Sequence, residues 1–260
     1  MMGKGHAALG AATWTATATF AFPHFSIDPN PAVLILGCLP VAGASLRPDI
    51  DHPNGTIANS GGFITGAIAS GANALSGGHR EGTHRLWFFA ACAIFDFFLA
   101  GTFGKPAALA LFFLYTAFGT QALATTTLHQ AMNRKWQKNT GIFSKLYCWA
   151  FAAAATGAAW YIFPANAEWW WLPIALTIGH FTHLVGDSLT TAGLEWANGH
   201  RVRFPIIGDA GSSRETLLSL ALAGVTVILI IGSVFGNPIE GLSLPDWNLP
   251  TGDDGGGGLR

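Results

Sequence analysis

Residues 169–189 read WWWLPIALTIGHFTHLVGDSL, and this stretch decides the class of fold. Its length matches the roughly 20 residues that cross a bilayer as a helix, and its first half is apolar. Its second half carries His180, His183 and Asp187, which share one face of a helix at this spacing. Ionisable side chains within a span are costly and usually mark a functional site. The stretch therefore predicts a membrane helix that carries part of a polar site, although a hydrogen-bonded cluster between helices is the alternative.

The whole chain has the composition of a membrane protein. Of its 260 residues, 50% are hydrophobic and only 10% are charged, whereas soluble domains carry about 25% charged residues. The formal net charge of −1 provides no overall attraction to nucleic acid, so no nucleic-acid partner is expected. Cys38, Cys92 and Cys148 lie far apart in apolar stretches, which predicts buried free thiols rather than disulfides.

The distribution of apolar residues predicts an all-α, polytopic helical membrane protein with about seven spans. Five stretches are long and apolar enough to span on their own: 86–103, 106–128, 143–163, 169–189 and 216–235. Two shorter stretches, 7–22 and 31–46, are expected to be spans as well. The small-residue stretch 61–76 suits a re-entrant or interfacial helix. Residues 1–236 are expected to form one membrane-embedded domain, and the acidic, glycine-rich tail 237–260 is expected to be disordered.

The basic residues orient these spans. If the N-terminus is inside, then the inside segments are 1–6, 47–85, 129–145 and 190–215. Only Lys105 and Arg260 then fall outside, which leaves eleven of the 13 lysines and arginines inside. The pattern predicts a bacterial-type inner (cytoplasmic) membrane protein with a cytoplasmic N-terminus and an external C-terminus.

Four short segments concentrate polar residues, and the first two are Gly5-His6 and Arg47 to Pro53. Prolines at both ends of the second segment exclude a regular helix, so Asp49, Asp51 and His52 are expected on a stiff turn. Carboxylates two residues apart repel each other unless a cation lies between them, which favours a divalent metal. A solvated loop whose acidic side chains cap the next helix is the alternative.

The third segment is GGHREGTHR at 77–85, and the fourth is the end of the opening stretch. The glycines of the third segment permit close approach of the backbone to an ion. His79 and His84 supply imidazoles, and Arg80 has the planar fork that suits phosphate oxygens. A basic flank at the inner face would explain Arg85 but not the histidines. The topology, assigned from lysines and arginines alone, places all four segments on the inner face, which favours one composite site.

In this order the four segments resemble the YdjM-type family of inner-membrane proteins, described as metal-dependent hydrolases. The matching text is Gly5-His6, LRPDIDHP at 46–53, GHREGTH at 78–84, and His183 through Asp187 into LTTAG at 189–193, with RFP at 203–205. The resemblance covers roughly residues 5 to 207. It implies a mostly helical fold related to zinc-dependent phospholipase C and the single-strand-specific zinc nucleases, whose sites hold several zinc ions.

The resemblance also implies a set of site residues. The metal ligands that it implies are His6, Asp49, Asp51, His52, His79, His84, His183 and Asp187. His180 is a possible additional ligand, although it stands where other members have a non-ligand aromatic residue. Arg80 and Asp51 are expected to be catalytic, and the cofactor is expected to be zinc, with two or more ions. The sequence departs from the family pattern at Arg85 and in a longer basic loop at 134–145.

These residues predict hydrolysis of a phosphoester at the cytoplasmic face of the membrane. Bound zinc lowers the pKa of water to about 7 and presents hydroxide as a nucleophile, and Arg80 would neutralise charge on the phosphate. A site at the level of the lipid headgroups favours a phospholipid or a lipid-linked phosphate. The lipid bilayer and this substrate are the expected partners.

Three other functions fit parts of the sequence. The first is a metal-independent lipid phosphatase of the phosphatidic acid phosphatase type. Arg47-Pro48, 76–79 and the His183/Asp187 pair weakly match the motifs of that class, but Thr177 and Ile178 occupy the positions where it has Ser-Arg. A metal-ion transporter needs polar residues through the depth of the membrane, and the outer halves of the spans hold only Asp96. The third alternative is a non-enzymatic membrane protein with a structural metal site.

Overall fold

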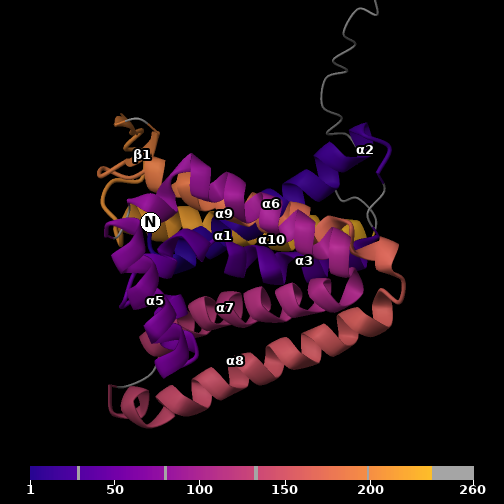
Figure 1. The fold of residues 1–260 in the computed structure, drawn as a ribbon, viewed down its shortest axis with the longest axis horizontal. Helices are drawn as coiled ribbons and strands as arrows, with labels where there is room; N and C mark the ends of the chain where they lie inside the picture. Colours follow the sequence, from indigo (N-terminus) through magenta and orange to yellow (C-terminus); the bar gives the residue numbers. More distant parts are fainter. Residues whose placement is uncertain (28–29, 79–80, 132–133, 198, 236–260) are drawn as a thin grey trace, which may run out of the picture.

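The computed structural model describes residues 1–27, 30–78, 81–131, 134–197 and 199–235, and for 125–144 it describes the backbone alone. The described chain is mostly helical (Figure 1). Its helices are α1 (Gly3–Ala16), the π-helical turn η1 (Thr17–Ala21), α2 (Phe22–His24), α3 (Pro31–Ala44), the 3-10 turn η2 (Arg47–Asp51), α4 (Thr56–Ser60), α5 (Phe63–Ser76), η3 (Gly82–His84), α6 (Leu86–Phe103), α7 (Lys105–Ala131), α8 (Arg134–Ile162), η4 (Asn166–Trp169), α9 (Trp171–Ser188) and α10 (Ser213–Phe235).

One segment departs from the all-α prediction. Strands β1 (Leu194–Ala197) and β2 (His200–Val202) form an antiparallel hairpin just after α9. Leu194 pairs with Val202, and Gly199 in the connection has a φ of +76°, a conformation that glycine adopts without strain. The expectation of helices alone was wrong here because the two strands are too short to leave a clear alternating pattern in the sequence.

Helix α9 lies at the centre of the bundle and packs against α1, α3 and α6 (Figure 1). Trp171, Leu172 and Leu176 of α9 are fully buried and belong to the main hydrophobic core. Trp14 of α1 is buried in the same core, and its indole N–H donates to the Leu34 carbonyl at 3.0 Å. Because protein surrounds α9, this helix can carry polar side chains that a lipid-facing helix would avoid.

Glycines bring the helices of this core close together. A Cβ added to Gly179 of α9 would lie 2.6 Å from the Val41 carbonyl oxygen of α3. One added to Gly43 of α3 would lie 1.7 Å from the Tyr115 carbonyl oxygen of α7. Small residues at such crossings let backbones approach, as is common between membrane helices. The contact at Gly179 holds the polar end of α9 against the end of α3.

Among the described residues, four helical segments are long and apolar enough to cross a membrane: Pro31–Asp51, Leu86–Phe103, Lys105–Ala124 and Ser213–Phe235. Only 6% of the Leu86–Phe103 window and 11% of the Ser213–Phe235 window are buried inside the protein, so α6 and α10 present apolar side chains outward. The remaining expected spans, 7–22, 143–163 and 169–189, coincide with helices that do not meet the same criterion among the residues searched. The count of seven spans therefore stays a prediction.

Helix α5 occupies the stretch predicted as a re-entrant or interfacial helix. It runs across the direction of α7 and α8, at the end of the bundle where α1 begins (Figure 1). Phe63 and Leu75 on this helix are 90% and 92% exposed. Its C-cap Gly77 is left-handed, with a φ of +84°. The expected disordered tail, 237–260, lies outside the described residues.

Candidate metal centre

The four polar segments converge at one end of the bundle. The beginning of α1 contributes His6, η2 contributes Asp49, η3 contributes His84, and the last turns of α9 contribute His183 and Asp187. We call these five residues the His/Asp cluster. Their ligand atoms form two overlapping groups of three, and within each group the atoms lie within 4.8 Å of one another. Residues up to 181 positions apart in the sequence, from 6 to 187, thus meet in one place.

The Nε2 atom of His183 lies at the centre of this cluster. It is 3.3 Å from Nε2 of His84, 3.6 Å from Oδ1 of Asp49 and 3.7 Å from Oδ2 of Asp187. Nε2 of His84 is 3.5 Å from the same Asp49 oxygen. Two donor atoms that each lie about 2.0–2.1 Å from a tetrahedral zinc ion are separated by roughly 3.4 Å. The spacing of the donor atoms therefore fits a zinc ion held between them.

The His183 ring is oriented by the end of α3. Its Nδ1 lies 2.6 Å from the carbonyl oxygen of Ser45, so Nδ1–H donates to this carbonyl and leaves the Nε2 lone pair facing the cluster. Hydrogen bonds of this kind fix the tautomer of metal-binding histidines. The ring also stacks on His6, with centroids 3.7 Å apart and an interplanar angle of 10°.

The His84 ring is oriented by a hydroxyl that the sequence analysis did not single out. Nδ1 of His84 lies 3.1 Å from Oγ1 of Thr83, and that hydroxyl donates to Oδ2 of Asp51 at 2.5 Å. Asp51 is fully buried and belongs to neither group of three. In this arrangement Asp51 orients the His84 ring through Thr83. In the sequence, only the position of Thr83 directly before the predicted ligand His84 indicated this contact.

Burial separates one carboxylate from the rest of the cluster. The side chains of His6, His84, His183 and Asp187 are at most 1% exposed, whereas that of Asp49 is 23% exposed. Asp49 therefore lies on the open side of the site. Both ring nitrogens of His6 are buried, and its Nε2 lies 3.3 Å from Oδ1 of Asp187, which the Met1 amino group also contacts at 2.5 Å. Nδ1 of His6 has no hydrogen bond among the described residues, and an ion or water would satisfy this buried atom.

The other predicted site residues lie elsewhere or outside the described residues. His52 is in neither group of three, and its Nδ1 accepts a hydrogen bond from the Asn54 amide at 3.1 Å. His180 is fully buried between Phe88 and Phe89, one turn before His183, and its ring nitrogens make no hydrogen bond with the part of the chain that is described. The predicted ligand His79 and the predicted catalytic Arg80 lie outside the described residues.

A buried ion pair connects η2 to α6. Nη2 of Arg47 lies 2.7 Å from Oδ2 of Asp96 on α6, and the guanidinium sits over the Tyr115 ring at 4.6 Å from its centroid. Arg47 is 5% exposed and Asp96 is 1% exposed. The sequence indicated Arg47 as an inside charge and as part of the segment 46–53, and Asp96 as an isolated exception, without relating the two. The pair accounts for Asp96 without a polar path across the membrane.

Two further contacts tie the surrounding segments together. The carboxylate of Glu215, fully buried in the first turn of α10, accepts the backbone amides of Met2 at 2.6 Å and Gly211 at 2.7 Å. In the sequence, the S-x-x-E spacing of Ser212 and Glu215 is typical of a helix start, and it would have indicated the beginning of α10. At the surface, hydrogen bonds to Glu81 and Glu195 raise the pKa of Arg85 and connect η3 to the hairpin.

Comparison with known proteins gives one result. Residues 1–238 match the model of a family described as YdjM inner membrane protein. This range includes all five residues of the His/Asp cluster. No curated protein and no solved structure gives a significant match.

Proposed function

We propose, on the premise that the chain belongs to the YdjM inner membrane protein family, that the His/Asp cluster binds zinc and hydrolyses a phosphoester of a membrane lipid. The observation that carries this proposal is the convergence of three imidazoles and two carboxylates, with separations of 3.3 to 3.8 Å between donor atoms of His84, His183, Asp49 and Asp187. Histidine and aspartate are the ligands of hydrolytic zinc sites. Family membership alone is a weaker warrant for an activity.

The two groups of three suggest how many ions the cluster holds. His183 belongs to both groups, and one nitrogen lone pair binds one ion. The cluster would therefore suit one zinc ion held by four of the five side chains, since Oδ1 of Asp187 is already paired with the Met1 amino group at 2.5 Å. Zinc, when bound, would lower the pKa of a bound water to about 7.

The protein residues then have separate tasks. Asp49, as the exposed carboxylate, is the group that can accept a proton from an attacking water on the open side. Asp51, expected from the sequence to be catalytic, is proposed as a positioning residue that acts through Thr83. Arg80 is proposed to bind the substrate phosphate, since its planar fork matches phosphate oxygens.

The position of the cluster supports a lipid as the substrate. Helix α5 packs against η2 and η3, which carry Asp49 and His84 of the cluster, and it exposes apolar side chains along its length. An amphipathic helix of this kind suits the boundary between headgroups and acyl chains. A phospholipid or a lipid-linked phosphate has its phosphate at the same level.

The proposal is tested on protein purified in detergent. We expect elemental analysis to find zinc in the wild type and His183→Ala to lose it, because His183 belongs to both groups of donors. His200→Ala is the matched control, since His200 is exposed on β2. We expect chelation to abolish release of phosphate or headgroup from a panel of phospholipids and lipid-linked phosphates, and zinc to restore it. Zinc-loaded protein that hydrolyses no member of the panel would contradict the proposal.

The same experiment separates the alternatives. Activity that survives chelation and is inhibited by vanadate would indicate a metal-independent lipid phosphatase instead. The near-complete burial of four of the five cluster side chains favours a structural ion as the second candidate. In that case His183→Ala would lower thermal stability, and the wild type would have no hydrolytic activity.

A further inference from the structure

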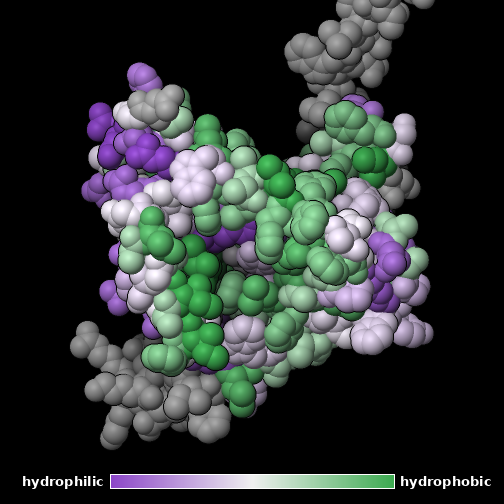
Figure 2. All heavy atoms as spheres, viewed as in Figure 1, coloured by the Kyte–Doolittle hydropathy of each residue, from purple (hydrophilic) through white to green (hydrophobic). Residues whose placement is uncertain are grey.

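The connection between α9 and α10 contains the RFP motif at 203–205, which has no role in the proposed function. We call residues 201–206, with the sequence RVRFPI, the basic-aromatic segment. The segment begins in β2 and continues beyond this strand as irregular chain. Figure 2 shows hydrophilic residues gathered around the hairpin at this end of the molecule, next to a hydrophobic surface.

The end of the segment exposes apolar side chains that the fold does not need. Phe204 is 60% exposed and Ile206 is 69% exposed, and Pro205 between them is exposed as well. The hairpin is attached to the protein by other side chains, because Ile207 and Leu194 are each 2% exposed. Residues 204–206 thus form an apolar tip. Such a tip suits the boundary between headgroups and acyl chains of a membrane.

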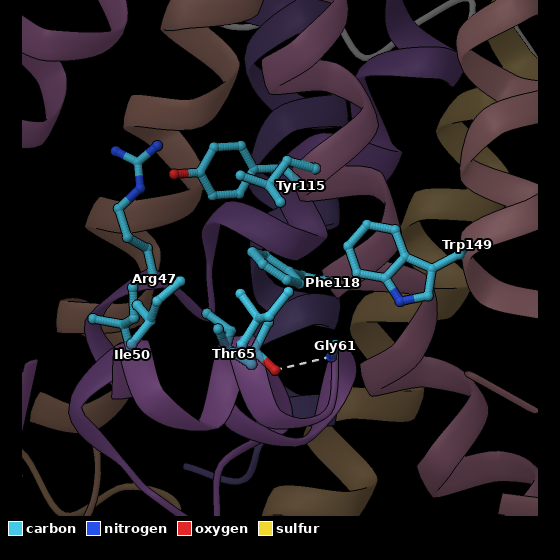
Figure 3. Close-up of a pocket in the computed structure, with 11 residues that line it drawn as sticks. Arg47, Ile50, Gly61, Thr65, Tyr115, Phe118 and Trp149 are labelled. Atoms are coloured by element: carbon cyan, nitrogen blue, oxygen red, sulfur yellow. Dashed lines mark hydrogen bonds between the residues drawn. The ribbon is translucent and has the colours of Figure 1, made fainter. Parts of the chain in front are cut away.

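The two arginines of the segment are available to a partner. Among the described residues, one N–H of Arg201 donates to the Ala192 carbonyl at 2.9 Å, and the Arg203 guanidinium makes no hydrogen bond or ion pair. Both arginines are exposed. Arg47 differs from them, since it is buried and lies over the Tyr115 ring, as Figure 3 shows. An exposed guanidinium has the planar fork that binds phosphate oxygens.

The charges around the segment favour an anionic partner. Residues 199–214 hold three arginines and one acidic residue, namely Arg201, Arg203, Arg214 and Asp209. The nearby glutamates bind within the protein: Glu195 pairs with Arg85, and Glu215 accepts backbone amides. The excess of positive charge attracts anionic lipid headgroups.

The apolar tip is continuous with a surface that faces the membrane. Helix α10 begins at Ser213, shortly after the segment, and its first turns expose Leu217 (68%) and Leu220 (66%). Only 11% of the α10 window is buried inside the protein. Because the chain belongs to a family of inner membrane proteins, lipid covers this face of α10. The same lipid layer is therefore the partner within reach of the tip.

Backbone hydrogen bonds join the segment to the end of α9. The Phe204 amide donates to the Ser188 carbonyl at 2.8 Å, and the Ile207 amide donates to the Leu189 carbonyl at 3.2 Å. Ser188 directly follows Asp187 of the His/Asp cluster. The depth of the segment in the headgroup layer therefore sets the depth of this end of α9.

We propose that the basic-aromatic segment binds the anionic headgroup layer of the membrane. Arg201 and Arg203 bind lipid phosphates, and Phe204 and Ile206 reach the boundary with the acyl chains. The partner is an anionic phospholipid, and this contact is separate from the substrate that the proposed function assigns to the cluster. The inference does not require the cluster to bind zinc.

The first test counts lipids bound to the full chain. Protein in detergent, with a chelator present so that a metal at the cluster plays no part, is titrated with phosphatidylglycerol or phosphatidylcholine and analysed by native mass spectrometry. We expect tighter binding of phosphatidylglycerol. Arg203→Gln should weaken this binding by about fivefold and Arg201→Gln/Arg203→Gln by about 25-fold, the factors that one and two basic side chains contribute at an anionic surface.

Two variants control for the loss of charge and of side chain. Arg203→Lys keeps the charge and should keep most of the affinity for phosphatidylglycerol. Lys145→Gln removes one charge from α8, which packs against α7 and α3, and should leave the affinity unchanged.

The second test measures the depth of the tip. Ile206→Cys, in a background without the natural cysteines, carries a nitroxide spin label in nanodiscs. The measurement is the collision rate of the label with a neutral, water-soluble nickel chelate. We expect this rate to fall when phosphatidylglycerol is added to phosphatidylcholine nanodiscs. The rate should not fall in the double arginine variant, because the arginines hold the tip against the anionic surface.

Each outcome supports or overturns the inference. Equal binding of the two lipids, or equal losses in Arg203→Gln and Lys145→Gln, overturns it. A label that stays in water in both kinds of nanodisc also overturns it and indicates a protein partner for the tip. Selective lipid binding by a zinc-loaded chain that hydrolyses no lipid supports the inference and contradicts the proposed function. Hydrolysis without any preference for anionic lipid in either test supports the proposed function and overturns the inference.

Discussion

Thr83 connects two buried residues of the site, and its hydroxyl can be removed without changing its shape. We expect Thr83→Val to lower zinc affinity by about 10–100-fold, the usual effect of losing a group that orients a metal ligand. The reason is that His84 Nδ1 and Asp51 would lose their common partner. The measurement is competition with a chromogenic chelator. Thr83→Ser is the control and should keep wild-type affinity, whereas an unchanged affinity in the valine variant would remove Thr83 from the site.

Asp96 neutralises Arg47 in a buried, apolar environment. We expect Asp96→Ala to lower the free energy of unfolding by about 3–5 kcal/mol, because it leaves a buried charge without its partner. The double variant Arg47→Met/Asp96→Leu removes both charges and should recover most of this loss. Unfolding in mixed micelles measures both values. If the single variant is as stable as the wild type, then the pair does not hold η2 as described.

Residues of the site differ in how far sequence could predict them. His183 and Asp187 were predictable because their helical spacing within an apolar stretch is a local pattern. Thr83 and Asp96 were not, because their partners lie 32 and 49 positions away. Local spacing therefore finds candidate ligands on one element, and only the folded chain identifies the groups that orient them.

At the scale of single elements, α5 offers two glycines with opposite roles. Gly77 is its left-handed C-cap, and Gly71 lies in its interior; a Cβ added at either position meets nothing within 4 Å. We expect Gly77→Ala to destabilise the protein by roughly 1–2 kcal/mol, the cost of a left-handed conformation for alanine. Gly71→Ala should stabilise it by roughly 0.5–1 kcal/mol. Thermal unfolding in detergent compares them, and shifts of the same sign would contradict the assigned end of α5.

Helices were easier to predict than the connections between them. Every expected span coincides with a helix, because long apolar stretches give a strong signal. The turn η2 was foreseen only as an irregular turn between Pro48 and Pro53. The hairpin at 194–202 was not foreseen, since its pairing depends on contacts rather than on a pattern within either strand.

The orientation of the whole molecule in the membrane is also testable. The exposed residues Ala167 and Ala192 flank α9, so they lie beyond opposite ends of this helix. In a background without the natural cysteines, we expect Ala167→Cys to react with a membrane-impermeant maleimide in intact spheroplasts. Ala192→Cys should react only after the membrane is permeabilised. Labelling of both positions in intact spheroplasts, or the reverse pattern, would contradict a cytoplasmic site.

Hydropathy identifies some of the expected spans more readily than others. Helices α6 and α10 have mostly outward-facing apolar side chains, and they were predicted over 86–103 and 216–235, close to their observed bounds. Helix α9 is surrounded by protein, and its two histidines and Asp187 lower its hydropathy below the level typical of a span. Hydropathy thus reports the surroundings of a helix as well as its topology, which is why composition describes the helix that carries His183 and Asp187 least well.

The turn Arg47–Asp51 contributes Asp49 to the cluster and Arg47 to the buried ion pair with Asp96. Five residues held in this way leave little freedom for either side chain to move alone. Under the proposed function, zinc at Asp49 and the ion pair at Arg47 therefore act on one structural unit. A ligand that binds only the folded turn stabilises it, and the ion pair keeps the turn folded for the ligand. Metal affinity and resistance to unfolding would thus report on the same five residues.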